Sequence, residues 1–566
     1  MALINLVANK RSVLQTVKLS AIIIVLLSAF VSSRAADSGA AHSVTEFGPF
    51  IANSTDPKTV AANTETLNRA LDRTGSQGGG EVTLPAGIFY LAPTHHEIGQ
   101  GNSAAIHIRY NNLTLRGAGI GKTVLRTRSE WSLVKSRVER GTGIRIHGSS
   151  APGFPRHGIV LAGFELDGGA GFTGKFGWPA STKDGDGWDI THKGIILSAD
   201  DYVDDVTLDS IYVHNYRGEV IYAGGGGLGR VRLNHVKSES TNASTFNITA
   251  DFVAEDCEFG KSRFWAEIGT RFPKKSGTFR RCHFHDASVI AIVLCQGDGG
   301  NQPYLFEDCM FENTPGVFGL FGGVGGPVVI RNNTFKNAGD ILSSSNAGGT
   351  TNDDNKNVLM ENNQATGSEA LVSLTGNATD WTIRKNTFVG RDPANPGLST
   401  AVFYGTANLH RCVIEENQFS DCRTPEQTDR MFAERPLFRG NTYTNVEQRS
   451  SHGSFYIAQD HPIPTPHSDL ITLNAGTPAA PTEFETKGYS DGHELIVQGG
   501  TPDAPVKFVP KAASYTVKAA RLLDGTRRLR FIFSAQEGKW IEGTPPLANT
   551  PGVKPGDVLI PVSGKQ

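Results

Sequence analysis

A short phrase recurs eight times between residues 252 and 443, and it constrains the fold more than any other feature of the chain. Each copy places Cys or Asn two positions before Phe, as in Cys257/Phe259 and Asn333/Phe335; Ala365 and Tyr443 replace Phe in two copies. Successive copies are 23 to 31 residues apart. A repeat of this length, built from short β-type runs, is typical of a solenoid.

Stacked turns convert each position of the phrase into a row along the solenoid axis, because equivalent residues lie about 4.8 Å apart. The phrase therefore predicts an interior Phe row and a turn row of Asn and Cys, whose amides bond to one another and to the backbone. The Cys residues of this row are expected to be unbridged thiols. Two positions before each Cys or Asn the charge alternates, which predicts a row of opposite neighbours: Glu255, Arg280, Glu307, Arg331, Glu361, Arg384, Glu415 and Arg439.

The composition excludes several classes of protein. A net charge of -2, with 19% charged residues, gives no indication of nucleic-acid binding. Six Cys without a CxxC pair argue against a zinc module and against a disulfide-dense scaffold. The sequence contains no phosphate-binding loop, zinc-protease motif or serine-hydrolase elbow in a credible context.

Residues 1–36 are predicted to be a signal peptide. Basic residues such as Lys10 precede the apolar run 21–30, and Ser33-Arg34-Ala35 offers a small-x-small cleavage site. The run is short for a membrane span, although an uncleaved anchor stays an open alternative. We therefore expect a secreted or periplasmic protein, with no membrane contact after cleavage.

Four further parts follow the signal peptide. The apolar spacing at 60–71 predicts a short helix that covers the open end of the solenoid. A Pro/Thr-rich passage is interpreted as a linker, and alternating strands follow it. The predicted boundaries are 37–103 for the cap, 104–450 for the β-helix, 451–492 for the linker and 493–566 for a small C-terminal β domain.

The sequence resembles the right-handed parallel β-helix proteins of the pectate-lyase-like superfamily over about residues 50–450. The residues that carry the resemblance are the capping helix, the segment 78–87 (GGGEVTLPAG), the turn at 113–117 and the Asn and Phe rows. The resemblance implies an all-β, single-stranded right-handed parallel β-helix and a carbohydrate-active protein. Motifs expected of polygalacturonases and of alginate epimerases are missing, and Asp200-Asp201 is interpreted as a turn.

Proteins of this fold use one strand per turn as the floor of a groove, and period-2 alternation allows its side chains to be assigned. The apolar pairs Ile144/Ile146, Ile195/Leu197, Val220/Tyr222, Phe246/Ile248 and Ala266/Ile268 are assigned inward. The main outward row is then predicted to be Arg145, Ile196, Ile221, Asn247 and Glu267.

This assignment concentrates chemically useful side chains in one patch. An outward Trp265 suits stacking on the C–H face of a sugar, and a cationic margin suits binding of carboxylates or sulfates. The insertion 168–192 is expected to form a wall of the groove. The candidate catalytic residues are Glu267, Arg263, Arg217, His192 and Glu219, and the candidate substrate-binding residues are Trp265, Asn247, Arg145, His147, Arg271 and Trp188.

Structural explanations of these residues remain open. Trp265 alternatively covers a loop or a subunit contact. Glu267 alternatively pairs with Arg263 or Arg271, and Glu219 with Arg217 or Arg263. The Asp-rich runs 184–189 and 200–205 are either solvated turns or a calcium site.

Three functions from different classes remain at this stage. A lyase would neutralise a uronate carboxylate with arginine or calcium, and Arg217, Arg263 or His192 would remove the adjacent proton. A glycoside hydrolase or transglycosidase would need two carboxylates on either side of the bond. A non-catalytic glycan-binding or adhesive protein is the third alternative. We favour a lyase that acts on an acidic polysaccharide, and a homotrimer is an open alternative.

Overall fold

A computed structural model describes most of the chain between residues 39 and 543. The predicted signal peptide lies outside the described residues. No helix among the described residues is long and apolar enough to cross a membrane. The described residues are 39–93, 103–127, 141–151, 153–169, 192–198, 201–223, 227–269, 275–295, 303–321, 327–345, 355–404, 409–423, 425–427, 436–447, 454–456, 470–474, 484, 486, 489, 491–498, 503, 505–524 and 528–543.

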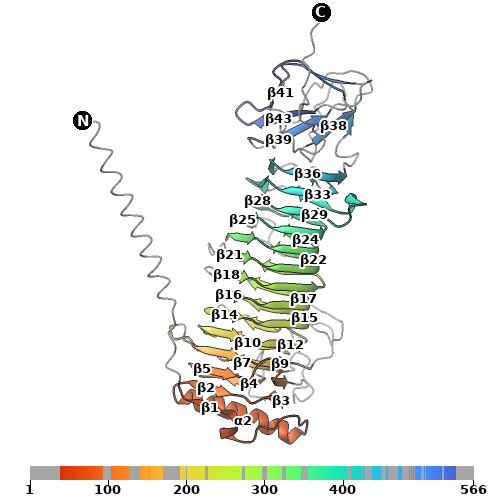
Figure 1. The fold of residues 1–566 in the computed structure, drawn as a ribbon. Helices are drawn as coiled ribbons and strands as arrows, with labels where there is room; N and C mark the ends of the chain where they lie inside the picture. Colours follow the sequence, from red (N-terminus) through yellow and green to blue (C-terminus); the bar gives the residue numbers. More distant parts are fainter. Residues whose placement is uncertain are drawn as a thin grey trace, which may run out of the picture.

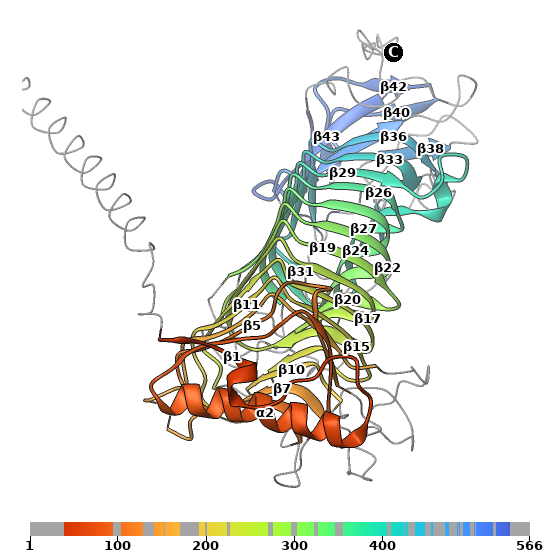
Figure 2. The same ribbon diagram turned by 60° about the horizontal axis from the view of Figure 1, so that its bottom comes forward.

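The described chain begins with a helix that covers the end of the solenoid. Helix α2, Pro57–Ser76, starts where the side chain of Asp56 accepts a hydrogen bond from the Thr59 amide at 2.9 Å. Its buried face includes Leu67 and Leu71, which join the core of the stacked sheets. Figure 2 shows the helix lying across the lowest coils. The predicted capping helix is therefore present, and it is longer than the apolar spacing indicated.

The body of the molecule is a right-handed parallel β-helix, as the sequence predicts (Figure 1). Each coil adds one strand to a first sheet and then crosses to a second sheet, to which it adds one or two strands. The described pairings between coils are parallel in both sheets, and they keep register except at local shifts in the pairings β10–β13, β15–β17 and β26–β29. One continuous hydrophobic core runs from Val44 to Phe438.

The first sheet contains 15 strands among the described residues. They are β1 Ala41–Ser43, β2 Gly80–Thr83, β5 Leu113–Arg116, β8 Ile159–Ala162, β11 Val206–Asp209, β14 Arg230–Asn234, β16 Asp251–Glu255, β18 Gly277–Arg280, β21 Tyr304–Glu307, β23 Val328–Arg331, β25 Asn355–Glu361, β28 Ala378–Arg384, β31 Leu409–His410, β32 Val413–Glu415 and β35 Leu437–Arg439. Short helices η1, Val44–Phe47, and η3, Pro396–Leu398, lie outside the sheets.

The second sheet contains 21 described strands and bends along its length. Strands that begin before the bend are β3 Gly87–Leu91, β6 Thr123–Thr127, β9 Glu165–Asp167, β12 Tyr212–Tyr216, β15 Lys237–Ile248, β17 Glu258–Gly269, β19 His283–Ala287, β22 Met310–Phe321, β24 Thr334–Ser345, β26 Gln364–Ser368, β29 Thr387–Gly390, β33 Gln418–Arg423 and β36 Thr442–Glu447. Strands that lie after it are β4 Ala104–Ile108, β7 Thr142–Ile146, β10 Ile195–Ser198, β13 Ile221–Ala223, β20 Ile290–Cys295, β27 Ala370–Leu374, β30 Thr400–Tyr404 and β34 Glu426–Gln427. We call the parts before and after the bend the first and second segments; the 12-residue strands β15, β17, β22 and β24 run through both.

A buried ladder of asparagines holds the corner between the first sheet and the first segments. The Asn386 Oδ1 atom accepts hydrogen bonds from the backbone amide and the Nδ2 of Asn363, at 3.0 and 2.9 Å. Its own Nδ2 donates to the Met360 carbonyl and to Asn417 Oδ1, both at 3.0 Å. Asn333 makes the same kind of contacts with Asn363 at the start of this series. The predicted amide row is therefore confirmed.

The interior aromatic row is also present. Phe259, Phe284, Phe311 and Phe335 stack in sequence, with ring centroids 5.1, 4.8 and 5.0 Å apart and interplanar angles of 20°, 9° and 11°. Cysteines take the place of Asn in the ladder beside the first three rings. The buried Cys257, Cys282 and Cys309 form no disulfide, which agrees with the prediction of unbridged thiols.

The alternating charges lie on adjacent coils, as expected. Arg280 bonds to Glu255 at 2.7 Å on one side and to Glu307 at 2.9 Å on the other. Strand register pairs every Glu of the row with Arg of the next coil. These ion pairs are partly exposed to solvent, so each stabilises the fold by about 1 kcal/mol or less. Their main effect is to avoid like charges one rung apart.

A small C-terminal unit follows the solenoid (Figure 1). Tyr515, Phe531 and Trp540 form the centre of its separate core. The range predicted as a linker contributes two of its strands: β37 pairs with β38, and β38 pairs with β39. Its strands are β37 Ser454–Tyr456, β38 Leu470–Asn474, β39 Glu494–Gln498, β40 Val506–Phe508, β41 Tyr515–Thr516, β42 Arg521–Leu523, β43 Arg528–Ser534 and β44 Lys539–Glu542.

Replacement of one ladder asparagine tests how much the amide row stabilises the fold. Asn386→Ala would leave the buried amide and Nδ2 of Asn363 without their acceptor and the Met360 carbonyl without a donor. We expect a loss of roughly 2–4 kcal/mol in the free energy of unfolding, measured by urea denaturation. The exposed Asn395, outside the ladder, is the control: Asn395→Ala should cost under about 1 kcal/mol. Equal losses in the two variants would contradict a stabilising role of the ladder.

Candidate functional site

The second segments form the face on which the sequence places the groove. In strands β4, β7 and β10, register aligns His107 with Arg145 and Arg145 with Ile196. The next coils align Asn247 with Glu267. These pairings confirm that the predicted residues share one row at these positions.

One coil of this row was assigned in the wrong register. Ile196 is in register with Tyr222, and Tyr222 with Asn247, so Tyr222 faces outward and Ile221 faces the core. Three consecutive residues, Glu219, Val220 and Ile221, are buried where this strand begins. Inward and outward side chains alternate only after them, so the sequence pattern alone does not show which of these positions faces outward. Tyr222 therefore replaces Ile221 in the row.

The outward placement of Trp265 is also wrong. Its side chain is fully buried, its ring lies near Phe284 and Phe311, and its Nε1 donates to the His285 carbonyl at 2.9 Å. The register of β15 and β17 shifts at the bend between Thr241 and Ser244, so simple alternation does not hold there. Trp265 is a core residue and cannot stack on a sugar.

A buried ion pair lies at the start of the second segments. Lys193 and Glu219 are 3% and 1% exposed, and their charged groups are in direct contact. Asn247 Nδ2 donates to the other carboxylate oxygen of Glu219 at 3.4 Å. The Lys193 ammonium also lies 4.2 Å from the ring centroid of Tyr222. The structure therefore brings together two predicted residues, Glu219 and Asn247, with two that sequence reasoning missed.

The pair is unusual because burial of two charges is unfavourable. Apolar residues of similar volume stabilise a protein equally well or better. Charged groups that persist in such a place are candidates for chemistry, because the scaffold alone gains little from burying them. Lys193 and Tyr222 are therefore added to the candidate site.

Three predicted catalytic residues lie at or near the bend. Arg217 and Arg263 directly follow Tyr216 and Ser262, which occupy one register row through Thr241, so both arginines lie at the same corner, two coils apart. Both are partly exposed. His192 is buried, with its Nδ1 accepting from the Arg217 amide at 3.2 Å and its ring 5.0 Å from Tyr216. This burial keeps the imidazole of His192 from solvent and argues against its use as a base.

Two further predicted binding residues lie near the N-terminal end of the face. Arg145 is buried at 7% exposure, and His147 is hydrogen-bonded to His107 across ring nitrogens 2.9 Å apart. The predicted residues Arg271 and Trp188 lie outside the described residues, as does the side chain of Glu267, whose backbone alone is placed.

The described part of the second Asp-rich run is occupied by other groups. Asp204 bonds to Arg230 at 3.0 Å, and Asp205 to Arg232 at 3.2 Å. These contacts favour the interpretation as charged turns over a calcium site. The first run, 184–189, lies outside the described residues.

One carboxyl group further along the solenoid has a raised pKa. Asp340 lies where β24 enters its second segment, in register with Gly316 and Ala370. Burial, followed by the charge of the neighbouring Glu369, raises the pKa of Asp340 to about 6. A carboxylic acid that is partly protonated near neutral pH is suited to donating a proton.

The first segments carry a strip of ionisable side chains that sequence reasoning missed. Tyr212 donates to Glu239 at 2.5 Å, and Lys237 and His285 both contact Glu258, at 2.8 and 3.1 Å. Burial, and then the hydrogen bond to Glu239, raises the pKa of Tyr212 above its usual range. We call the residues Tyr212, His214, Lys237, Glu239, Glu258 and His285 the first-segment strip.

The signal for this strip was present in the repeated phrase itself. Glu258 precedes Phe259, and His283 and His285 flank Phe284. Period-2 alternation around an inward Phe places all three on the outer face. The phrase was interpreted as scaffold alone, although its outward positions carry groups with acid–base and metal-binding chemistry.

Comparisons with known proteins identify the fold. A family model described as a right-handed beta helix region matches residues 269–427. No curated protein matches the chain.

Several solved structures are similar in fold. A mannuronan C-5 epimerase A-module from Azotobacter vinelandii is 15% identical, with a TM-score of 0.41, 72% of this chain and 96% of that chain covered. A family 28 exopolygalacturonase from Yersinia enterocolitica is 12% identical, with a TM-score of 0.45 and coverage of 72% and 78%. A surface adhesin from Streptococcus pneumoniae is 13% identical, with a TM-score of 0.40 and coverage of 72% and 92%. The likeness extends to the fold and no further.

Removal of one or both members of the buried pair tests its cost. Lys193→Met leaves Glu219 charged and buried, so we expect a loss of about 3–5 kcal/mol in the free energy of unfolding. The double variant Lys193→Met/Glu219→Leu removes both charges and should recover most of that loss. Urea unfolding of the two single variants and the double variant measures the coupling. Additive losses would show that the two groups do not stabilise one another.

The raised pKa of Asp340 predicts how stability changes with pH. Its folded-state pKa of about 6 exceeds the ordinary value of 3.8, so folding favours the protonated acid. Asp340 therefore destabilises the fold progressively as pH rises from 4 to 6, by on the order of 1–3 kcal/mol. Asp340→Asn removes this term, so its stability relative to the unmodified protein should increase between pH 4 and pH 7. The exposed Asp503→Asn serves as a control, and a pH-independent difference for Asp340→Asn would contradict the raised pKa.

Proposed function

We propose that the protein is a secreted or periplasmic polysaccharide lyase that cleaves an acidic, uronate-containing polymer by β-elimination on the second-segment face. The observation that carries this proposal is the arrangement of Tyr222 over the ammonium of Lys193, which is itself paired with the buried Glu219. This arrangement places an acid–base group and a fixed positive charge side by side.

The charge balance of the face supports an anionic polymer. Arg217 and Arg263 are partly exposed at the bend, and the buried Arg145 and Lys193 add positive charge beneath the face. The described carboxylate among them is Glu219. Guanidinium groups bind carboxylates in a bidentate manner, and a uronate polymer offers one carboxylate on each acidic sugar.

The elimination needs a base for the proton next to the carboxylate. As that proton moves to the base, a carbon–carbon double bond forms and the bond to the glycosidic oxygen breaks. The departing oxygen takes up a proton from the protonated base or from water. Tyr222 is the proposed base, because the ammonium of Lys193 faces its ring and stabilises negative charge on the phenol. Glu219 holds the ammonium of Lys193 in place, and Asn247 holds the carboxylate of Glu219. An arginine near the substrate carboxylate stabilises the developing charge.

Hydrolysis or transglycosylation is a second candidate, supported by the raised pKa of Asp340 beside Glu369. Asp340 would be the general acid of such a reaction. The two candidates use different parts of the solenoid, so single variants separate them. A non-catalytic glycan-binding role is the third outcome.

The decisive experiment is product analysis on a panel of acidic and neutral polysaccharides. A lyase creates a conjugated double bond that absorbs in the ultraviolet, whereas a hydrolase creates new reducing ends without it. Tyr222→Phe should reduce double-bond formation by at least about 100-fold without loss of folding. Tyr110→Phe is the matched control and should retain full activity, because Tyr110 lies against helix α2, several coils before Tyr222.

Other outcomes overturn the lyase proposal. Reducing ends without ultraviolet absorbance, lost in Asp340→Asn and kept in Tyr222→Phe, would establish hydrolysis. Binding of a polysaccharide without turnover would establish a glycan-binding protein. Full lyase activity in Tyr222→Phe would reject the assignment of the base.

A further inference from the structure

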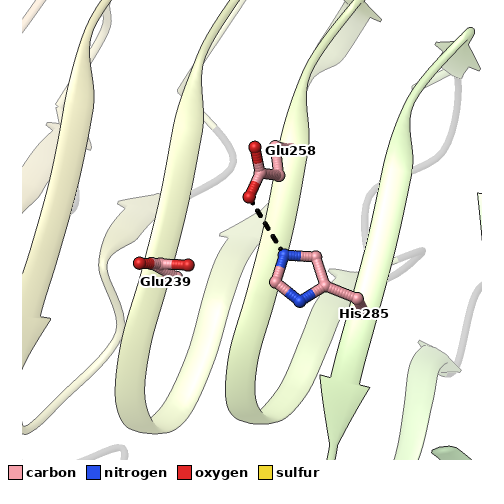
Figure 3. A group of neighbouring side chains, drawn as sticks. All are labelled: Glu239, Glu258 and His285. Atoms are coloured by element: carbon pink, nitrogen blue, oxygen red, sulfur yellow. Dashed lines mark hydrogen bonds and ion pairs between the residues drawn. The ribbon is translucent and has the colours of Figure 1, made fainter. Parts of the chain in front are cut away.

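Two carboxylates and an imidazole from three consecutive coils meet on the first-segment strip (Figure 3). Glu239 of β15, Gly260 of β17 and His285 of β19 occupy one register row, and Glu258 of β17 lies in the adjacent outward row. Potential metal-ligating atoms of Glu239, Glu258 and His285 all lie within 4.8 Å of one another. The three side chains therefore converge on a space of the size of one ion.

A glycine makes this convergence possible. A Cβ atom built on Gly260 would lie 2.2 Å from His285 Cε1 and 2.3 Å from its Nε2. The imidazole therefore lies over the backbone of the intermediate coil and reaches back toward Glu239 and Glu258. Any larger residue at position 260 would displace the ring.

Glu239 supplies an independent indication of a missing ligand. Its side chain is 95% buried, one oxygen accepts the Tyr212 hydroxyl, and the other, Oε2, has no hydrogen-bond partner. Lys237 is its nearest described cation, with the ammonium 3.6 Å from Oε2. A buried carboxylate oxygen without a hydrogen bond is unfavourable, and coordination to a cation satisfies it.

The histidine is oriented as metal-binding histidines are. Its Nδ1 lies 2.9 Å from Asp286 Oδ2. Asp286 is held in turn by Asn313 through its other oxygen, at 3.0 Å. When Nδ1–H donates its hydrogen bond to Asp286, the lone pair of Nε2, which lies 3.1 Å from Glu258 Oε1, is available to a metal.

We infer that Glu239, Glu258 and His285 form a site for a divalent transition metal of the zinc class. Zinc accepts one imidazole nitrogen and two carboxylates as ligands. These three protein ligands leave the fourth position of a tetrahedral site to a water molecule. Calcium and magnesium prefer all-oxygen sites and are poor matches for an imidazole. This site stands apart from the second-segment face and does not depend on elimination chemistry.

Lys237 competes with the metal for these carboxylates. Its ammonium lies 2.8 Å from Glu258 and also faces Glu239, while Lys261 lies 3.8 Å from Glu239. The Lys237 side chain is 34% exposed, so it can withdraw into solvent when a metal binds. Removal of this charge should therefore strengthen metal binding.

The test is calorimetric titration of the chelator-treated, full-length protein with zinc chloride. We expect one zinc ion per chain with a micromolar or tighter dissociation constant, and no comparable heat with calcium. Glu239→Gln and His285→Ala should weaken binding by at least about 100-fold. His283→Ala, a partly exposed histidine two residues away, is the control and should bind zinc as the unmodified protein does.

Two further variants test the geometry. Gly260→Ala should weaken zinc binding, because the added carbon displaces the imidazole, and Lys237→Met should tighten it several-fold. Circular dichroism establishes that each variant is folded; if His285→Ala is not, Glu239→Gln decides. Absence of zinc binding in the unmodified protein, or equal affinity in Glu239→Gln, would overturn the inference and, in the second case, place the zinc elsewhere.

Discussion

The structure depends on one constraint: parallel coils stacked in register place like positions about 4.8 Å apart along the whole axis. Each side chain must therefore be compatible with the side chain at the same position of the next coil. Aromatic rings stack, amides bond in series and charges must alternate, as the contacts of Arg280 with Glu255 and Glu307 illustrate. Stability is distributed over many equivalent contacts, and no single row determines the fold.

Functional groups on such a scaffold are recognised where a row stops repeating. The pair Lys193 and Glu219 buries two charges inside the scaffold, and Gly260 interrupts a row of long polar side chains. Both departures are unfavourable for the scaffold alone, one through burial of charge and the other through loss of a side chain. Each lies beside a group with the chemistry to bind or transform a ligand.

The sequence predicted the rows of the scaffold because those rows depend on local period and on coil-to-coil repetition. The Asn ladder, the Phe stack and the alternating charges needed no knowledge of distant contacts. Trp265 and Ile221 were misassigned because the second sheet bends, and at a bend two consecutive residues can both be buried. The metal-type cluster was missed for another reason. Glu258 and His285 belong to the repeated phrase, which was interpreted as packing alone, and Glu239 lies on the coil before the first copy of the phrase.

Helix α2 has a consequence beyond burial of Leu67 and Leu71. The first coil of a parallel solenoid is an open strand edge with the same spacing as a growing cross-β fibril. A second copy of the chain would find there a template that matches its own last coil in pitch and direction. The helix blocks that template, and the C-terminal strands follow the other end of the stack (Figure 1). The terminal elements thus limit the length of a polymer that the repeat alone would extend without end.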